Sequence, residues 1–244
     1  MVVNHGKHTL VYDTGGGRPG GYTAADAAVI PFLHHRNIRH IDTLIVSHAD
    51  NDHSAGTQAL LDAFPVQRLL LGQELPGVAR GSLCRAGKAW SWPGDTRFQL
   101  FTGVVAGQGA ANSNDASCVL GVDLAGYRFL LPGDISAGRE RELVRYWRQD
   151  LRADWLLAAH HGSGSSTAAA WLRAVDPIGA VLNYGRANHF RHPHPAVLER
   201  LAQRAIEIRA TAREGAILFR VSGDGTLRIS TGRDGHTAFW RPPG

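Results

Sequence analysis

The chain has few cysteines and no long apolar run, and each of these absences excludes a class of protein. No stretch of about 18 consecutive apolar residues occurs in the 244 residues, so no segment is expected to span a bilayer. Residues 1–7 lack the apolar core of a signal peptide. Cys84 and Cys118 form no C-x-x-C pair, which argues against a thiolate zinc site. One disulfide or two free thiols would fit this pair, and we favour two free thiols in a reducing cytoplasm.

The chain does contain enough apolar side chains for a folded core. Hydrophobic residues make up 43% of the sequence, which excludes a largely disordered chain. The formal net charge is +5 and the sequence pI is about 9.7, with the excess contributed by arginine. A basic surface attracts polyanions such as nucleic acids, although many soluble proteins carry this charge without such a partner.

Strand-like and helix-like segments alternate along the sequence. The patterns predict strands at residues 8–12, 42–47, 66–71, 98–103, 116–123, 127–131, 155–159 and 178–184. They predict helices at residues 57–64, 137–148, 167–175 and 195–205, and a helix from Thr23 that ends or kinks at Pro31. Residues 72–97 have no clear period, residues 206–229 are expected to form β hairpins, and residues 233–244 to be loosely held. This alternation predicts two sheets packed face to face with helices outside, in a single domain over residues 1–244.

Potential metal ligands are concentrated directly after the strand expected at residues 42–47. His48, Asp50, Asp52 and His53 place four such side chains within a short loop before a helix. Such a loop can turn its side chains in different directions, so that two neighbouring ions can be bound. The alternative is an exposed polar loop that caps the helix, but burying this many polar groups without an ion is costly. The pattern therefore predicts a metal-dependent hydrolase.

Other polar residues follow other expected strands, where catalytic side chains usually gather. Asp134 can bridge two cations, although a Gly-Asp pair is also a common turn. His160 and His161 precede a glycine-serine loop in which Ser163 and the backbone N–H groups can approach a phosphate. The remaining candidates lie in segments that are otherwise simple polar loops: Asn114 as an oxygen ligand or hydrogen-bonding group, and Arg191 and His192 as substrate contacts.

Taken in order, these segments resemble the metallo-β-lactamase superfamily across most of the chain. The segments are Asp13-Thr-Gly, His48-x-Asp-x-Asp-His, Gly133-Asp and His160-His-Gly-Ser. More narrowly, they are similar to the soluble C-terminal hydrolase domain of ComEC-type competence proteins, the DNA uptake channels of naturally transformable bacteria. The resemblance implies an α/β fold, a four-layer αββα sandwich, with two metal sites at the sheet edge. It also implies a nuclease that degrades the DNA strand that is not taken up.

The resemblance gives each candidate residue a role. The metal ligands would be His48 and Asp50 for one ion, Asp52, His53 and His160 for the other, and Asp134 for both. The catalytic candidates are Asp52, His161 and His192, with either histidine protonating the leaving oxygen or clamping the phosphate. Asp13 would orient ligands, and Asn114, Ser163 and Arg191 would contact the substrate or support the site.

Two departures from the superfamily pattern concern the metal. The usual motif is His-x-His-x-Asp-His, and here the second histidine is Asp50. A lone histidine usually lies between that motif and the bridging aspartate, but no histidine occurs between His53 and His160. Because oxygen-rich ligand sets suit harder ions, we expect two divalent ions, Mn²⁺ in preference to Zn²⁺ or Mg²⁺, with one site weaker than the other.

The resemblance also sets expectations for partners and surroundings. We expect a monomer that binds DNA, preferentially single-stranded, and the membrane channel portion of the same protein, without inserting into the membrane itself. We expect it on the cytoplasmic side of an inner membrane, as a soluble fragment whose first strand is truncated, since only Met1–Asn4 precedes the loop at His5. The alternatives are a hydrolase of a small lactone, thioester or phosphodiester on the same fold, and a non-catalytic module that guides DNA.

Overall fold

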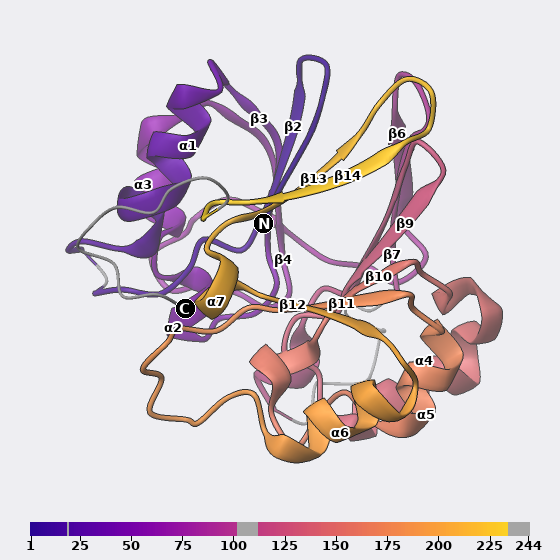
Figure 1. The fold of residues 1–244 in the computed structure, drawn as a ribbon. Coiled ribbons are helices and arrows are strands. Elements are labelled where there is room, and N and C mark those ends of the chain that lie inside the picture. The colour runs from indigo at the N-terminus through magenta and orange to yellow at the C-terminus, as the bar shows by residue number, and fades with distance from the viewer. Residues whose placement is uncertain (19, 102–111, 234–244) are drawn as a thin grey trace. The chain divides into compact units, whose positions relative to one another are not determined.

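A computed structural model describes residues 1–18, 20–101 and 112–233 of the chain (Figure 1). Tertiary contacts divide it into two compact units, which are described separately below. Unit 1 contains Met1–Trp92 and Gln99–Leu120, and unit 2 contains Pro93–Phe98 and Gly121–Gly244. Within the described ranges, every helix is too short or too polar to cross a lipid bilayer.

Unit 1 is built on a five-stranded sheet with the order β1-β2-β3-β4-β5. The strands of this sheet are β1 (Val2–His5), β2 (His8–Tyr12), β3 (Ile41–Val46), β4 (Val66–Leu71) and β5 (Ser82–Leu83). Unit 1 also contains β6 (Ala89–Trp92), which lies outside this sheet. β1 pairs antiparallel with β2, and β2, β3, β4 and β5 are parallel to one another. The helical segments are η1 (Ala25–Val29), α1 (Ile30–His35), α2 (Asn51–Ser54), α3 (Thr57–Ala63) and η2 (Asn114–Ala116).

The core of unit 1 lies between this sheet and the helices α1 and α3, which cover one of its faces (Figure 1). Leu44 of β3, Leu33 of α1 and Leu60 of α3 are all completely buried in one apolar cluster. A parallel strand buried on both faces needs consecutive apolar residues, which β3 provides in its second half, Leu44–Val46. The parallel arrangement brings the carboxyl ends of β2, β3 and β4 to the same edge of the sheet.

Two local features of unit 1 differ from the predictions. The helix does not end at Pro31, because a π-helical turn, η1, runs directly into α1 and places the proline in the first turn of α1. A proline there leaves no required backbone hydrogen bond unmade, which is why the helix continues. The strand at residues 2–5 was also not predicted: Val2–His5 forms β1 and pairs with β2 over four residue pairs.

Gly72 marks the closest approach between backbone segments at the sheet edge of unit 1. Its N–H donates to the Val46 carbonyl at 3.0 Å, just where β3 ends. A Cβ atom at this position would overlap the carbonyl oxygen of Ser47. Only glycine therefore allows the chain after β4 to pack against the start of the histidine- and aspartate-rich loop.

Unit 2 is built on a mixed sheet that contains the order β12-β11-β10-β9-β8-β7. The strands are β7 (Thr96–Leu100), which unit 2 shares with unit 1, β8 (Leu120–Leu124), β9 (Tyr127–Leu131), β10 (Trp155–Leu157), β11 (Gly179–Leu182) and β12 (Glu207–Ala210). β9, β10, β11 and β12 are parallel. Helical segments connect the strands: α4 (Ala137–Trp147), η3 (Arg148–Leu151), η4 (Ala159–Gly162), α5 (Ala169–Val175), α6 (Pro195–Gln203) and α7 (Thr211–Glu214). In Figure 1, α4, α5 and α6 lie together beside this sheet.

The end of the chain only partly follows the hairpin prediction. Glu207–Ala210 joins the sheet as β12, parallel to β11, and is followed by the short helix α7. The hairpin itself consists of β13 (Ile217–Val221) and β14 (Leu227–Thr231), which turn at the predicted glycine-rich segment. The pairing of β12 depends on a neighbour about 28 residues away in sequence, so local patterning does not reveal it. Of the predicted loose tail, residues 234–244 lie outside the described residues.

Glu140 is a completely buried carboxyl group that ties α4 to the start of α5. It accepts hydrogen bonds from the backbone N–H groups of Thr167, at 2.5 Å, and Ala168, at 2.9 Å. Burial raises the pKa of Glu140 to about 7, although these hydrogen bonds and the nearby Arg200 act in the opposite direction.

Glu140→Gln is expected to flatten the pH dependence of stability. Because the folded state holds this proton more tightly than the unfolded state, the contribution of Glu140 is fully present below the unfolded pKa of 4.5 and is lost as the pH rises to about 7. This shift corresponds to at most roughly 3 kcal/mol. Urea unfolding at about pH 5 and about pH 8 measures it. The exposed Glu199 on α6 gives a matched control in Glu199→Gln; an equal pH dependence for wild type and Glu140→Gln would contradict the assignment.

Candidate metal centre

In unit 1, Asp13 connects the ends of two neighbouring parallel strands. It follows β2, and one of its carboxylate oxygens accepts the backbone N–H of Ser47, which follows β3, at 2.7 Å. The other oxygen accepts the Ser47 hydroxyl at 3.0 Å and faces Nδ1 of His53 at 2.8 Å. Asp13 has a left-handed φ of 61°, which aspartate tolerates better than most residues. The predicted supporting role of Asp13 is therefore consistent with three specific contacts.

These contacts fix the orientation of His53, which is 5% exposed. Because a carboxylate only accepts hydrogen bonds, His53 donates through Nδ1 to Asp13, and its Nε2 keeps a lone pair. That Nε2 lies 3.8 Å from a carboxylate oxygen of Asp52, whose side chain is half exposed. Metal-binding histidines in proteins are commonly held in this way, with the far nitrogen donating to a carboxylate.

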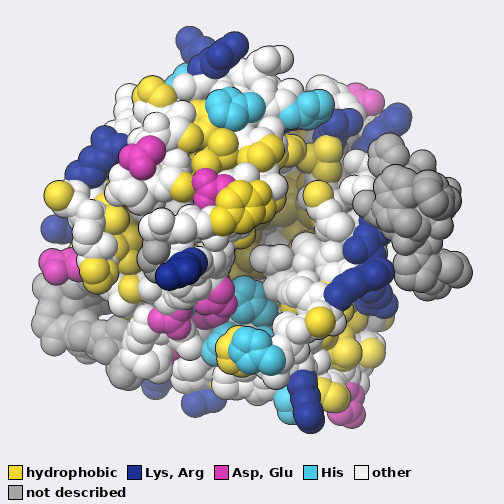
Figure 2. Space-filling view, turned by 90° about the vertical axis from the view of Figure 1, so that its left-hand side faces the viewer, with side chains coloured by type: hydrophobic (Ala, Val, Ile, Leu, Met, Phe, Trp, Pro, Cys, Tyr) yellow, Lys and Arg dark blue, Asp and Glu magenta, His cyan; other side chains and the backbone are white. Residues whose placement is uncertain are grey.

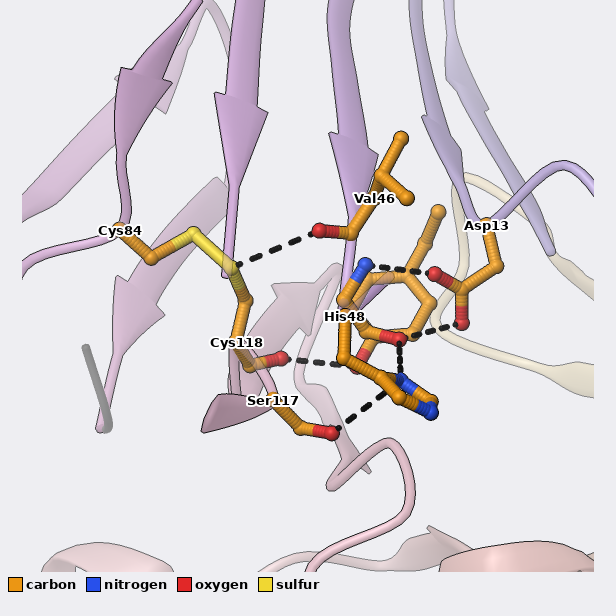
Figure 3. Close-up of a disulfide and its surroundings, with 8 residues drawn as sticks. Asp13, Val46, His48, Cys84, Ser117 and Cys118 are labelled. Carbon is orange, nitrogen blue, oxygen red and sulfur yellow. Dashed lines mark hydrogen bonds between the residues drawn. A yellow bond between two sulfur atoms is a disulfide. The ribbon is translucent and has the colours of Figure 1, made fainter. Parts of the chain in front are cut away.

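His48 is completely buried and is oriented through a serine (Figure 3). The hydroxyl hydrogen of Ser47 goes to Asp13, so the Ser47 oxygen, 3.0 Å from His48 Nδ1, accepts a hydrogen bond from that imidazole. Nε2 of His48 is thereby left with its lone pair, and it lies 3.6 Å from Asp50. Ser117 is a second, longer contact of His48 Nδ1, at 3.4 Å. Both ring orientations, of His48 and His53, thus trace back to Asp13.

The segment before β8 supports Asp50 and also supplies an unpaired oxygen. Ser113 donates to the second carboxylate oxygen of Asp50 at 2.7 Å and lies 3.3 Å from Gln73. Within the described part of the chain, Oδ1 of Asn114 is buried and has no hydrogen-bond partner. A buried amide oxygen is expected to be paired, so Asn114 suits the predicted role of an oxygen ligand or a contact to a bound group.

Cys84 and Cys118 form a disulfide, which corrects the prediction of two free thiols (Figure 3). They are separated by 34 residues, and both are completely buried. The bond joins the end of β5 to the segment that carries Ser117. Cys118 also donates its N–H to the Ser47 carbonyl at 2.9 Å, and its carbonyl accepts the Tyr12 hydroxyl at 2.7 Å. The sequence contained no signal for this pairing beyond the presence of two cysteines.

In unit 2, Asp134 and two histidines come together after β9 and β10. Asp134 is 4% exposed. The Nε2 atoms of His160 and His161 lie 3.8 Å and 3.6 Å from the same Asp134 oxygen. Both histidines have left-handed backbones, with φ of 51° and 55°, a costly conformation that is most often found at functional sites.

The two histidines differ in how they are held. His161 places Nδ1 2.8 Å from the carbonyl oxygen of Asn183, so it donates there and directs the lone pair of Nε2 toward Asp134. His160 instead has its ring 5.8 Å from that of His192. The arrangement typical of a metal-binding imidazole is therefore found at His161, whereas the sequence prediction chose His160 as the ligand.

The remaining predicted residues of unit 2 lie on two loops. Burial, followed by the positive charges of His160 and His161, lowers the pKa of His192. Arg191 is exposed. The Ser163 hydroxyl lies 3.0 Å from that of Ser165, in the loop that follows His161.

Each unit thus contains a set of donors that suits a divalent cation. In unit 1 the set is His48, Asp50, Asp52 and His53, with Asp13 and Asn114 beside it, and in unit 2 it is Asp134 with His160 and His161. In His48, His53 and His161 a hydrogen bond at Nδ1 fixes the orientation of the ring, and Nε2 points toward a carboxylate. This arrangement is more typical of a metal site than of an ion pair between histidine and aspartate. Sequence reasoning missed Ser47, Ser113, Ser117 and Gln73. Of these, Ser47 was recognisable, because it directly precedes the ligand motif.

Comparison with known proteins agrees with these features. A model of the metallo-beta-lactamase superfamily matches residues 1–186. Recombination protein 2 of Haemophilus influenzae is 34% identical over 218 residues, which cover 89% of this chain and 26% of that protein. Competence protein ComA of Neisseria gonorrhoeae is 31% identical over 225 residues, with coverages of 92% and 31%. ComE operon protein 3 of Bacillus subtilis is 27% identical over 219 residues, with coverages of 82% and 27%.

The chain spans about a quarter to a third of the length of these relatives, which are ComEC-type competence proteins. The predicted α/β class and the resemblance to such proteins are confirmed, and the fold is the metallo-β-lactamase fold. With a family model that covers residues 1–186 and the two histidine-carboxylate sets in the expected order, this chain belongs to the metallo-beta-lactamase superfamily.

Proposed function

We propose that this chain is a metal-dependent deoxyribonuclease that hydrolyses phosphodiester bonds of DNA during DNA uptake. Membership of the metallo-beta-lactamase superfamily supports a metal-dependent hydrolase, and similarity to competence proteins supports a role in DNA uptake. The observation that carries the proposal is the orientation of the buried histidines. In both His48 and His53 a hydrogen bond at Nδ1 fixes the ring, so that Nε2 faces a carboxylate. Such an arrangement is built for cations rather than for a simple hydrogen-bond network.

In this proposal, the candidate ligands of unit 1 hold two metal ions. His48 and Asp50 would hold one ion, and Asp52 and His53 the other. Asp50 replaces an imidazole with a carboxylate, and Asn114 is the best-placed candidate for a further oxygen donor because its Oδ1 is buried and unpaired within the described residues. Bound divalent ions would supply Lewis acidity to the phosphodiester and lower the pKa of the attacking water.

Unit 2 contains the remaining candidate residues. Asp134 would be a carboxylate ligand, and we assign the imidazole ligand to His161, because its Nδ1 is hydrogen-bonded to the Asn183 carbonyl. His192 then takes the role of exchanging a proton with the leaving oxygen, and His160 lies beside it to contact the phosphate. Arg191 would neutralise a neighbouring phosphate of the strand. Lys and Arg side chains are spread over the face drawn in Figure 2, which suits contact with a long polyanion.

Mn²⁺ is expected to restore cleavage to metal-stripped protein at least about tenfold better than Zn²⁺, because carboxylate and amide oxygens favour the harder ion. The assay follows labelled single- and double-stranded DNA with Mn²⁺, Mg²⁺ and Zn²⁺ in turn, and elemental analysis measures the bound ions. We expect two ions per chain with unequal affinity. Activity that tracks Zn²⁺ content and does not return with Mn²⁺ would overturn the metal assignment.

The same experiment separates the proposed nuclease from the other functions considered. Turnover of a lactone, thioester or small phosphodiester without DNA cleavage would identify a small-molecule hydrolase. Fewer than one ion per chain, with DNA binding retained and no cleavage, would identify a module that only guides DNA. Cleavage of single-stranded DNA that requires the added ion supports the nuclease.

We also propose that the domain works as a monomer beside the membrane channel portion of a larger protein, in an oxidising compartment. The expectation from sequence was the cytoplasmic side, but the Cys84–Cys118 disulfide argues for the opposite side, because reducing cytoplasms keep thiols free.

A further inference from the structure

Phe190 is a large apolar side chain that is exposed beside the histidines of unit 2. Its side chain is 66% exposed, although burying a phenylalanine stabilises a fold by about 1.5–3 kcal/mol. It lies in the loop between β11 and α6, two residues before His192. An aromatic ring exposed to solvent next to candidate catalytic residues does not stabilise the fold by burial, and such exposed apolar groups often mark a binding site.

The Phe190 ring is the outer member of a series of rings that leads to the candidate metal ligands of unit 2. It is nearly parallel to the His192 ring, with centroids 5.8 Å apart and an interplanar angle of 14°. His192 in turn lies 5.8 Å from His160, which is close to Asp134. The ring of His189 also lies 4.0 Å from Phe190 and is tilted by 39° to it. A planar group resting on Phe190 would therefore lie within a short distance of the reacting groups.

Hydrogen bonds of Asn188 fix the conformation of the loop, and this conformation keeps the Phe190 ring exposed to solvent. The Asn188 side chain accepts the His192 N–H at 2.7 Å and donates to the His192 carbonyl at 2.9 Å, which closes a tight turn around Phe190. It also donates to the Gly185 carbonyl at 2.9 Å. Preorganising an exposed ring in this way lowers the entropic cost of binding a ligand to it.

We propose that Phe190 is a stacking platform for an unpaired nucleobase, and that it makes the site prefer single-stranded DNA. An aromatic ring followed directly by an exposed arginine, Arg191, matches the two parts of a nucleotide, a planar base and a phosphate. Bases in a duplex are stacked on their neighbours and are not available to such a ring. This inference rests on the proposed deoxyribonuclease and adds to it the residue that selects the strand.

The first test measures binding of a fluorescent oligo-dT to the whole protein by anisotropy, with EDTA present to prevent cleavage. Phe190→Ala should weaken binding about tenfold, while Phe190→Tyr and Phe190→Trp should stay within about twofold of wild type. Phe190→Leu keeps the bulk but not the π face and should resemble Phe190→Ala. Tyr146→Ala is the matched control, because Tyr146 is a 77% exposed aromatic residue of α4 in the same unit, and it should have no effect.

The second test pairs the protein change with a change in the DNA. An oligonucleotide of abasic sites should bind wild type about as weakly as oligo-dT binds Phe190→Ala, and the two changes together should cost little more than either alone. If removal of the bases weakens wild type and Phe190→Ala equally, the base does not rest on Phe190 and the inference is wrong. Failure of wild type to bind single-stranded DNA at all would also overturn it.

Cleavage assays distinguish failure of this inference from failure of the proposed function. One outcome is that wild type and Phe190→Ala both cleave single-stranded DNA with the same KM and kcat, while Phe190→Ala and removal of the bases act additively on binding. That result would support the nuclease and contradict the stacking role of Phe190. If no DNA is cleaved under any metal condition but the coupling between Phe190 and the base is present, the platform stands and the nuclease does not.

Discussion

Asp134→Asn is expected to reduce DNA cleavage at least about a thousandfold, because removing a carboxylate from a metal site costs several kcal/mol and each 1.4 kcal/mol of lost transition-state stabilisation is a factor of ten. Asp134 is 4% exposed and faces Nε2 of both His160 and His161. An amide is uncharged and offers only one oxygen, so it binds a divalent cation less tightly than a carboxylate does. DNA binding should be largely kept, since most of its energy comes from charges spread along the strand.

The measurement compares initial cleavage rates, bound metal and oligonucleotide affinity for wild type and Asp134→Asn. Asp176→Asn is a matched control in the same unit, because Asp176 has a half-exposed side chain whose ion pair with Arg204, at 2.9 Å, contributes little. It should cleave as wild type does. Undiminished cleavage by Asp134→Asn, with the fold intact by circular dichroism, would refute the assignment of Asp134 as a metal ligand.

Replacing both cysteines, as Cys84→Ser with Cys118→Ser, should lower the free energy of unfolding of unit 1 by about 3–4 kcal/mol. The disulfide closes a loop of 34 residues, and loop-closure entropy gives that magnitude. The loss should also reach the candidate metal site, because Cys118 bonds the Ser47 carbonyl and follows Ser117, a contact of His48. We therefore expect weaker metal binding as well as lower stability.

Denaturant unfolding with and without a thiol reductant separates the disulfide from the substitution itself. Reductant should destabilise wild type and leave the double serine variant unchanged, because that variant has no bond to reduce. The same midpoint for oxidised wild type and the double variant would show that the bond does not stabilise the fold. Alkylation of thiols in intact cells, before any reduction, tests the proposed compartment, since the disulfide predicts that neither cysteine is labelled.

Several elements were predictable because the information for them is local. β2 was predicted with its observed bounds at residues 8–12, and β9 at 127–131, since both are short β-prone segments. α4 was predicted within one residue, because its capping serine and its period are contained in one segment. The helix after Thr23 was not, because whether Pro31 ends a helix depends on the turn before it.

The candidate site likewise contains residues that local sequence reveals and residues that it does not. His48, Asp50, Asp52 and His53 were recognisable because a strand end places consecutive ligands together, whatever the rest of the chain does. The Ser117 hydroxyl was not, since Ser117 meets His48 only across 69 residues of sequence. The exposure of Phe190 was equally invisible, because a phenylalanine in a sequence is expected to be buried.

The sequence by itself determined the family of this protein and its local motif of candidate ligands, whose carboxylates are the basis for predicting a harder metal ion. These properties follow from residue identity and from spacings of a few positions. The tertiary structure alone decided how each imidazole ring is oriented, which cysteines are bonded and which aromatic ring faces solvent. Each of these depends on atoms brought within about 3–4 Å of one another from distant parts of the chain, and such contacts are set by packing rather than by any local pattern.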